Sequence, residues 1–142
     1  MNSAKKLQLV SWGLLLAGVS IAPVRQGPET RKQAPLAEAR YNAALKQFNL
    51  IWQYYRQSRV DSFDVYAWSR LLLEASKGLS DRPDKWIAAY EEHLDRMIKL
   101  EALIKKIRRL GFGLSSDVGA SEYFRIEAEC WLAEVKAAAK AQ

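Results

Sequence analysis

The amino-acid sequence predicts an all-α protein in which two tandem helical hairpins form an antiparallel four-helix bundle, preceded by an N-terminal signal or anchor helix. Two observations support this fold class. Apolar residues recur at helical spacing in four segments of residues 36–142, with glycine and capping residues between them. The sequence also repeats itself at an offset of 53 positions, so residues 36–79 and 83–140 form two copies of one hairpin.

Residues 38–79 align with residues 91–132 without a gap, and twelve of the aligned positions are identical. The repeat is clearest where each copy turns from its first helix into its second. The matched residues there are Ser62, Asp64, Val65 and Ala67 in the first copy and Ser115, Asp117, Val118 and Ala120 in the second. A single hairpin exposes an apolar face that it cannot bury alone, so we expect the two copies to bury each other.

Residues 1–24 have the layout of an export signal, because Lys5 and Lys6 precede eighteen residues, 7–24, that carry no charge. A cleaved signal peptide is the first interpretation and a retained membrane anchor the second, since eighteen residues are at the short end of a bilayer span. A buried N-terminal helix is the third. Export predicts a periplasmic or other extracytoplasmic body, and an anchor would hold it at the inner membrane through residues 7–24.

Residues 25–35 are predicted to form a semi-extended tether, because three of the four prolines lie between positions 23 and 35. The first helix then carries one apolar stripe and ends near Ser58. The members of this stripe are Tyr41, Leu45, Phe48, Trp52 and Tyr55. We expect Ser62 to be the N-cap of the second helix, which ends near Gly78.

The second hairpin has similar start and stop signals. Its first helix follows Ser80 or Asp81 as the cap, has Pro83 in its first turn, and ends at Gly111 and Gly113. Ser115 is the expected cap of the last helix. Two neighbouring rows predict a wide buried face there: Tyr123, Ile126, Cys130, Ala133 and Ala137 in one, and Phe124, Ala128, Trp131 and Val135 in the other.

The turn in which Gly111 is followed by Ser115, Asp117 and Val118 resembles the repeat of TolC-type outer-membrane efflux proteins. In that family a helix ends at glycine, and a hydrophobic-Ser segment leads into an Asp-Val helix start and an Ala-rich helix. The chain departs from the family pattern at Ser58, Asp61, Trp68, Leu114 and Ser121. No segment alternates like a membrane strand, so the resemblance implies an exported helical-hairpin protein without a channel.

The composition excludes several classes of site. One Cys and one His cannot supply a zinc site or a haem attachment within a single chain, so we expect no metal and no cofactor. The net charge of +6 is too small to predict nucleic-acid binding. His93 is expected to lie at a solvated rim without a nucleophile beside it. We therefore predict that the protein is not an enzyme.

Two further expectations concern the last helix. Cys130 is predicted to be a buried thiol, with an intermolecular disulfide as the alternative in an oxidising compartment. Glu127, Glu129 and Glu134 are expected to balance the basic end of the preceding helix.

Two groups of residues are candidate binding sites. An aromatic group around the first turn could anchor a protein partner, with plain core packing as the alternative. Its members are Phe48, Trp52, Tyr55, Phe63, Tyr66 and Trp68. A basic group could contact a polyanion or phospholipid headgroups, although helix dipoles also favour cations at such a helix end. Its members are Lys105, Lys106, Arg108 and Arg109.

From these features we expect an exported structural or interaction module, for example an accessory subunit of an envelope or membrane protein complex that binds a protein partner. The alternative is a small-ligand binder linked to transport and related to efflux machinery. That alternative requires a pocket between the two hairpins lined by Tyr90, His93 and Trp131.

Overall fold

The computed structural model describes the backbone of residues 28–141 and the side chains of residues 34–141. The predicted signal or anchor helix at residues 1–24 lies outside this range. Within it the all-helical prediction is confirmed, with four helices and no strand. They are α1 (Pro28–Arg56), α2 (Ser62–Lys77), α3 (Pro83–Arg109) and α4 (Ser115–Lys140). No helix in the described part of the chain is both long enough and apolar enough to cross a membrane.

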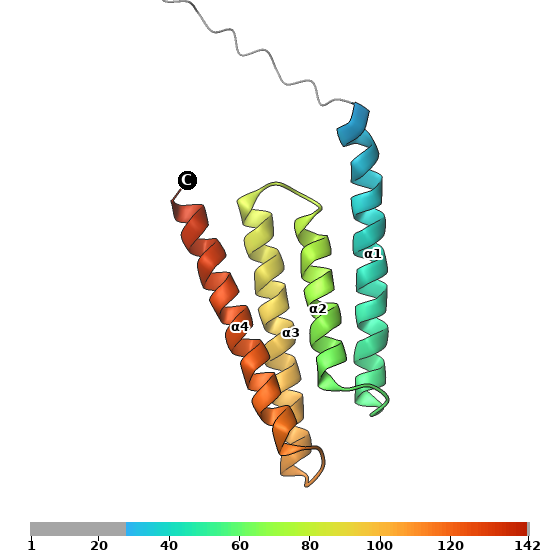
Figure 1. The fold of residues 1–142 in the computed structure, drawn as a ribbon, viewed down its shortest axis with the longest axis vertical. Helices are drawn as coiled ribbons and strands as arrows, with labels where there is room; N and C mark the ends of the chain where they lie inside the picture. Colours follow the sequence, from blue (N-terminus) through green and yellow to red (C-terminus); the bar gives the residue numbers. More distant parts are fainter. Residues whose placement is uncertain (1–27, 142) are drawn as a thin grey trace, which may run out of the picture.

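The four helices lie side by side in chain order, each antiparallel to the one before it (Figure 1). α1 packs on α2, α2 packs on α3, and α3 packs on α4, while α2 also touches α4. The backbone of α1 approaches neither α3 nor α4 over the described residues. The helices therefore form a bundle that is open between α1 and α4, and the hairpins contact each other mainly through α2.

The predicted tether is helical over most of its length, because α1 begins at Pro28. Proline is well accepted in the first turn of a helix, where its missing N–H would have no partner. Residues 29–34 then include Glu, Arg, Lys, Gln and Ala, all of which favour helix. The helix continues through Pro35 at the loss of one backbone hydrogen bond.

The two hairpin turns have the same backbone structure, as the repeat predicts. Ser58 and Gly111, which are 53 positions apart, both adopt left-handed conformations with φ of 57° and 86°. The next N–H in each turn donates back to the helix, from Arg59 to the Tyr54 carbonyl (2.9 Å) and from Phe112 to the Ile107 carbonyl (3.2 Å). Each turn is thus a Schellman motif, and the predicted equivalence of the two corners is confirmed.

The caps differ from the prediction by one or two positions. The carboxylate of Asp61, not the hydroxyl of Ser62, accepts the N–H of Asp64 (3.0 Å), because Ser62 is turned into the core. Leu114 occupies the cap position of α4, and its N–H donates to the Asp117 carboxylate (3.3 Å).

At the start of α3 the cap position is also displaced from the prediction. Arg82 occupies it, where Ser80 or Asp81 was expected. The hydroxyl of Ser80 instead accepts the N–H of Arg82 (3.2 Å) within the loop.

The hydrophobic core lies along the inner faces of the four helices. Its largest fully buried side chains include Leu72, Leu73, Met97 and Leu100. On α4 only the row of Phe124 and Ala128 is buried. The neighbouring row was predicted to be buried too, but Tyr123 is 61% exposed, Ile126 is 44% exposed, and Cys130 is exposed. The reason is that α4 packs on α3 and only touches α2, so a single row meets its neighbours.

Candidate functional site

A buried polar cluster joins the two hairpins at the contact between α2 and α3. The hydroxyl oxygen of Ser69 lies 2.8 Å from Nδ1 of His93, and Nε of Arg96 donates to the same oxygen at 2.8 Å. Ser69 and His93 are completely buried. The prediction of a rim histidine is therefore wrong, because α2 covers the His93 face of α3.

His93 is uncharged at neutral pH. Burial lowers its pKa to about 4, and the positive charges of Arg96 and Arg70 contribute to the same direction. Since the Ser69 oxygen accepts from Arg96, its own hydrogen is available to Nδ1, which favours the tautomer with hydrogen on Nε2. Nε2 is buried without a hydrogen-bond partner among the described residues.

Serine beside histidine is also the arrangement of a nucleophile and its base. Here the Ser69 side chain has no exposure to solvent, so a substrate cannot reach the hydroxyl. What the pair does in this structure is hold α2 against α3 through hydrogen bonds. The same cluster leaves one nitrogen of Arg96, Nη2, buried and without a hydrogen-bond partner in the described part of the chain.

Aromatic stacking extends this contact to α4. The ring of Tyr66 stacks on Phe124 with centroids 4.1 Å apart, and the ring of His93 stacks on Trp131 at 5.7 Å. The hydroxyl of Tyr66 donates to the Glu127 carboxylate. Burial and this carboxylate raise the pKa of Tyr66 to about 12, so the tyrosine stays protonated and continues to donate.

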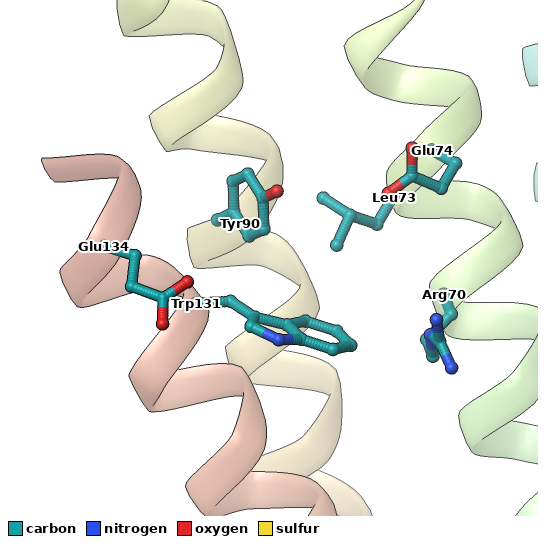
Figure 2. A pocket seen from close by; sticks show the side chains of 6 residues that line it. All are labelled: Arg70, Leu73, Glu74, Tyr90, Trp131 and Glu134. Atoms are coloured by element: carbon teal, nitrogen blue, oxygen red, sulfur yellow. The ribbon is translucent and has the colours of Figure 1, made fainter. Parts of the chain in front are cut away.

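A pocket of about 270 Å³ opens beside this cluster, between α2, α3 and α4. Figure 2 shows its lining, which consists of Arg70, Leu73, Glu74, Tyr90, Trp131 and Glu134. Tyr90 and Trp131 were predicted for a pocket between the hairpins. His93 was predicted there too, but it lies behind the Trp131 ring and does not line the pocket.

The lining of this pocket carries both signs of charge. The guanidinium of Arg70 lies over the Trp131 ring, 5.2 Å from its centroid. Lys77 lies over the Tyr90 ring at 5.4 Å and pairs with the Glu74 carboxylate at 3.2 Å. The Glu134 carboxylate faces the pocket from α4 (Figure 2). A ligand with both a cationic and an anionic group therefore meets partners for each.

A second, mainly apolar groove of about 400 Å³ runs between α1 and α2. We call it the α1–α2 groove, and its lining consists of Arg40, Ala43, Ala44, Gln47, Trp68 and Leu71. Among these residues only Trp68 belongs to the predicted aromatic group. The remaining residues are Leu71, two alanines, Gln47 and Arg40, none of which the sequence distinguishes from other helix residues. The signal that identifies them is their correspondence, at the offset of 53, to residues of the second hairpin.

The predicted aromatic group is divided between core and surface. Phe48 and Tyr66 are buried in the core, and Trp52, Tyr55 and Trp68 are partly buried against it. Phe63 is 60% exposed, although its ring also contacts those of Tyr66 and Phe124. Most of the group therefore serves core packing.

The predicted basic group lies at the free end of the α3–α4 hairpin (Figure 1). All four of its side chains are exposed, and Lys105 pairs with Glu101 at 2.7 Å. The turn that follows exposes Leu110, Phe112 and Leu114, each about two-thirds. An apolar tip beside cations suits an anionic phospholipid surface, so headgroup contact stays a prediction.

The acidic residues of α4 do not balance this basic end as expected. Glu127 binds Tyr66 and Tyr123, Glu129 pairs with Arg125 at 2.6 Å, and Glu134 faces the pocket. The partner of Lys105 is instead Glu101, which also pairs with Arg125 at 2.7 Å.

Cys130, predicted to be buried, is an exposed free thiol, so its alternative role in an intermolecular disulfide stays a prediction. The described residues contain no group of three or more His, Cys, Asp or Glu side chains placed to hold a metal ion.

No protein-family model, curated protein or solved structure matches this chain. The resemblance to TolC-type repeats therefore stays a prediction that rests on the turn residues alone.

Proposed function

We propose that this protein is an exported module of two duplicated helical hairpins that binds a helix of a protein partner, as an accessory subunit of an envelope or membrane complex. The partner helix occupies the α1–α2 groove. One observation carries the proposal: the corresponding groove of the second hairpin is filled by a helix, α2 of the same chain.

The correspondence holds residue by residue. At the offset of 53 the lining of the α1–α2 groove corresponds to His93, Arg96, Met97, Leu100, Ser121 and Phe124. We call this set the α3–α4 groove. There α2 covers the residues, with Tyr66 stacked on Phe124 and Ser69 bonded to His93, and five of the six side chains are buried. The same hairpin surface in the first copy faces solvent as an open groove.

The chemistry of the α1–α2 groove also suits a helix. Ala43 and Ala44 leave room for a helix backbone to approach closely, and Trp68 and Leu71 offer apolar surface beside them. Leu71 is 47% exposed without a partner helix. A helix that inserts apolar side chains at positions i, i+3 and i+7 would cover this surface, as is usual for helix-in-groove recognition.

The test uses an exposed alanine in the α1–α2 groove and a matched control. The variant Ala43→Arg fills the groove with a long charged side chain, whereas Ala102→Arg makes the same change on the solvent face of α3. Cells that produce the tagged full-length variants are fractionated and cross-linked. We expect the partner to be recovered with the unmodified chain and with Ala102→Arg but not with Ala43→Arg. Equal recovery with both variants would refute the proposal.

A second candidate function is supported by the pocket between the hairpins. Its aromatic rings, Arg70 and the carboxylates of Glu74 and Glu134 suit a small aromatic zwitterion, such as a free aromatic amino acid. Calorimetric titration with phenylalanine should then give a saturable heat that Arg70→Gln and Glu134→Gln each weaken. Absence of heat with phenylalanine, tyrosine and tryptophan would argue against this candidate.

A further inference from the structure

The chain carries a helix face that matches its own open groove. The face of α2 that fills the α3–α4 groove includes Tyr66, Ser69 and Leu73, all of which are buried. At the offset of 53 these positions correspond to Gly119, Glu122 and Ile126 on α4.

That face of α4 is open to solvent. Gly119, Glu122 and Ile126 are all exposed, and so are Tyr123 and Cys130 beside them. α4 and α1 are the two outermost helices (Figure 1), and their backbones do not approach each other within the described residues. One surface can therefore meet the other only across two molecules.

The charges on the two surfaces are complementary. Ser69 lies 2.8 Å from His93 in the filled groove, and the corresponding residues are Glu122 on α4 and Arg40 on α1. A copy of α4 seated like α2 would bring the Glu122 carboxylate beside the guanidinium of Arg40. Neither residue takes part in an ion pair among the described residues.

We propose that copies of this chain associate head to tail, with α4 of one molecule seated in the α1–α2 groove of the next. This proposal rests on the proposed function and names the partner helix. Within the chain, residues 9–24 are the segment that corresponds to α2 at the offset of 53, and they are the alternative occupant of the groove. They carry no carboxylate to meet Arg40, whereas α4 supplies Glu122. The interface joins two different surfaces, so it leaves a free surface at each end and adds molecules in a row.

A charge-swap experiment tests the proposal with full-length chains. The variants Arg40→Glu and Glu122→Arg each place like charges across the interface, because each changes one of its two surfaces. When the two variants are mixed, both possible contacts between different chains carry opposite charges again. Arg56→Glu is the matched control, since it makes the same charge change at the exposed end of α1, outside both surfaces. Far-UV circular dichroism checks that all variants keep their helices.

Sedimentation velocity then measures association between about 10 and about 500 µM, the range of micromolar affinities. We expect the average mass of the unmodified chain and of Arg56→Glu to rise at least about twofold over this range, as an affinity within it requires. Each swapped variant alone should stay monomeric, and their mixture should regain the rise.

Other results would overturn the inference. A chain that stays monomeric at every concentration refutes self-association, and so does association that neither swap weakens. In the first case, a cysteine introduced by Ala43→Cys in a Cys130→Ser background measures access to the groove through its rate of alkylation. If this cysteine resists alkylation in the monomer, the occupant of the groove is the chain's own residues before α1. Loss of the cellular partner with Ala43→Arg but not Ala102→Arg, without self-association, would keep the proposed function and remove only the second copy as the occupant.

Discussion

Uptake of a proton by the single histidine should favour the unfolded state as the pH falls below about 6.5. His93 has a pKa of about 4 in the folded chain, against an ordinary value near 6.5, because it is buried beside Arg96 and Arg70. As the pH falls below about 6.5 the unfolded chain takes up the proton first, so stability is present above this pH and is lost toward pH 4.

The size of the effect follows from the same two pKa values. At about pH 5 the pH is about 1.5 units below the pKa of the histidine in the unfolded chain, which is therefore protonated, while the histidine in the folded chain is still neutral. Each pH unit corresponds to about 1.4 kcal/mol of unfolding free energy. The expected loss relative to neutral pH is about 2 kcal/mol, a large part of the 5–15 kcal/mol by which domains are typically stable. No other histidine titrates in this range, since the chain contains only one.

Urea unfolding followed by circular dichroism at about pH 7.5, 6 and 5 measures the free energy directly. The control is His93→Gln, which keeps a polar side chain at the position but does not titrate. We expect the unmodified protein to lose about 2 kcal/mol between the extremes and His93→Gln to lose much less. If both proteins lose the same amount, or neither loses any, the assignment of a buried neutral His93 is wrong.

Three further predictions concern the repeat itself. Ser58→Gly should raise the free energy of unfolding by about 1 kcal/mol, and Gly111→Ala should lower it by about the same amount. Both positions are left-handed, and only glycine adopts this conformation without strain. Urea titrations of the two variants should therefore show changes of opposite sign. Asp61→Ala should cost about 1 kcal/mol in the same assay through loss of the cap on α2. Glu101→Gln alone should lower the thermal midpoint, whereas Glu101→Phe combined with Arg125→Leu should restore or raise it, because these are the residues of the first copy.

Much of the backbone could be predicted because it depends on neighbours in sequence. Helical spacing identified four helices, and the matched residues identified two equivalent turns. The structure repeats even their hydrogen bonds. The caps were displaced because several acceptors stand close together there. At the first turn, the Asp61 carboxylate reaches the Asp64 N–H while Ser62 is drawn into the core.

The burial of individual side chains could not be predicted in the same way, because it depends on which helix covers which face. Two rows of α4 are equally apolar in sequence, yet only the row of Phe124 meets α2 and α3. His93 looks like a surface residue between Glu92 and Asp95 until α2 covers it. The α1–α2 groove could not be predicted from single residues, because its alanines and Gln47 are residue types that occur anywhere on a helix.

The differences between the two copies follow from whether each groove is filled within the chain. In the second hairpin α2 is always present, and the positions that meet it carry groups specific to it, such as His93 and Arg96 for the hydroxyl of Ser69. In the first hairpin the same two positions are Arg40 and Ala43, an exposed charge and a small residue. An exposed charge beside a small residue suits a surface that faces solvent and leaves room for a helix, as the proposed docking requires. Under the proposed docking, the difference at these two positions separates a contact made within one chain from a contact made between two chains.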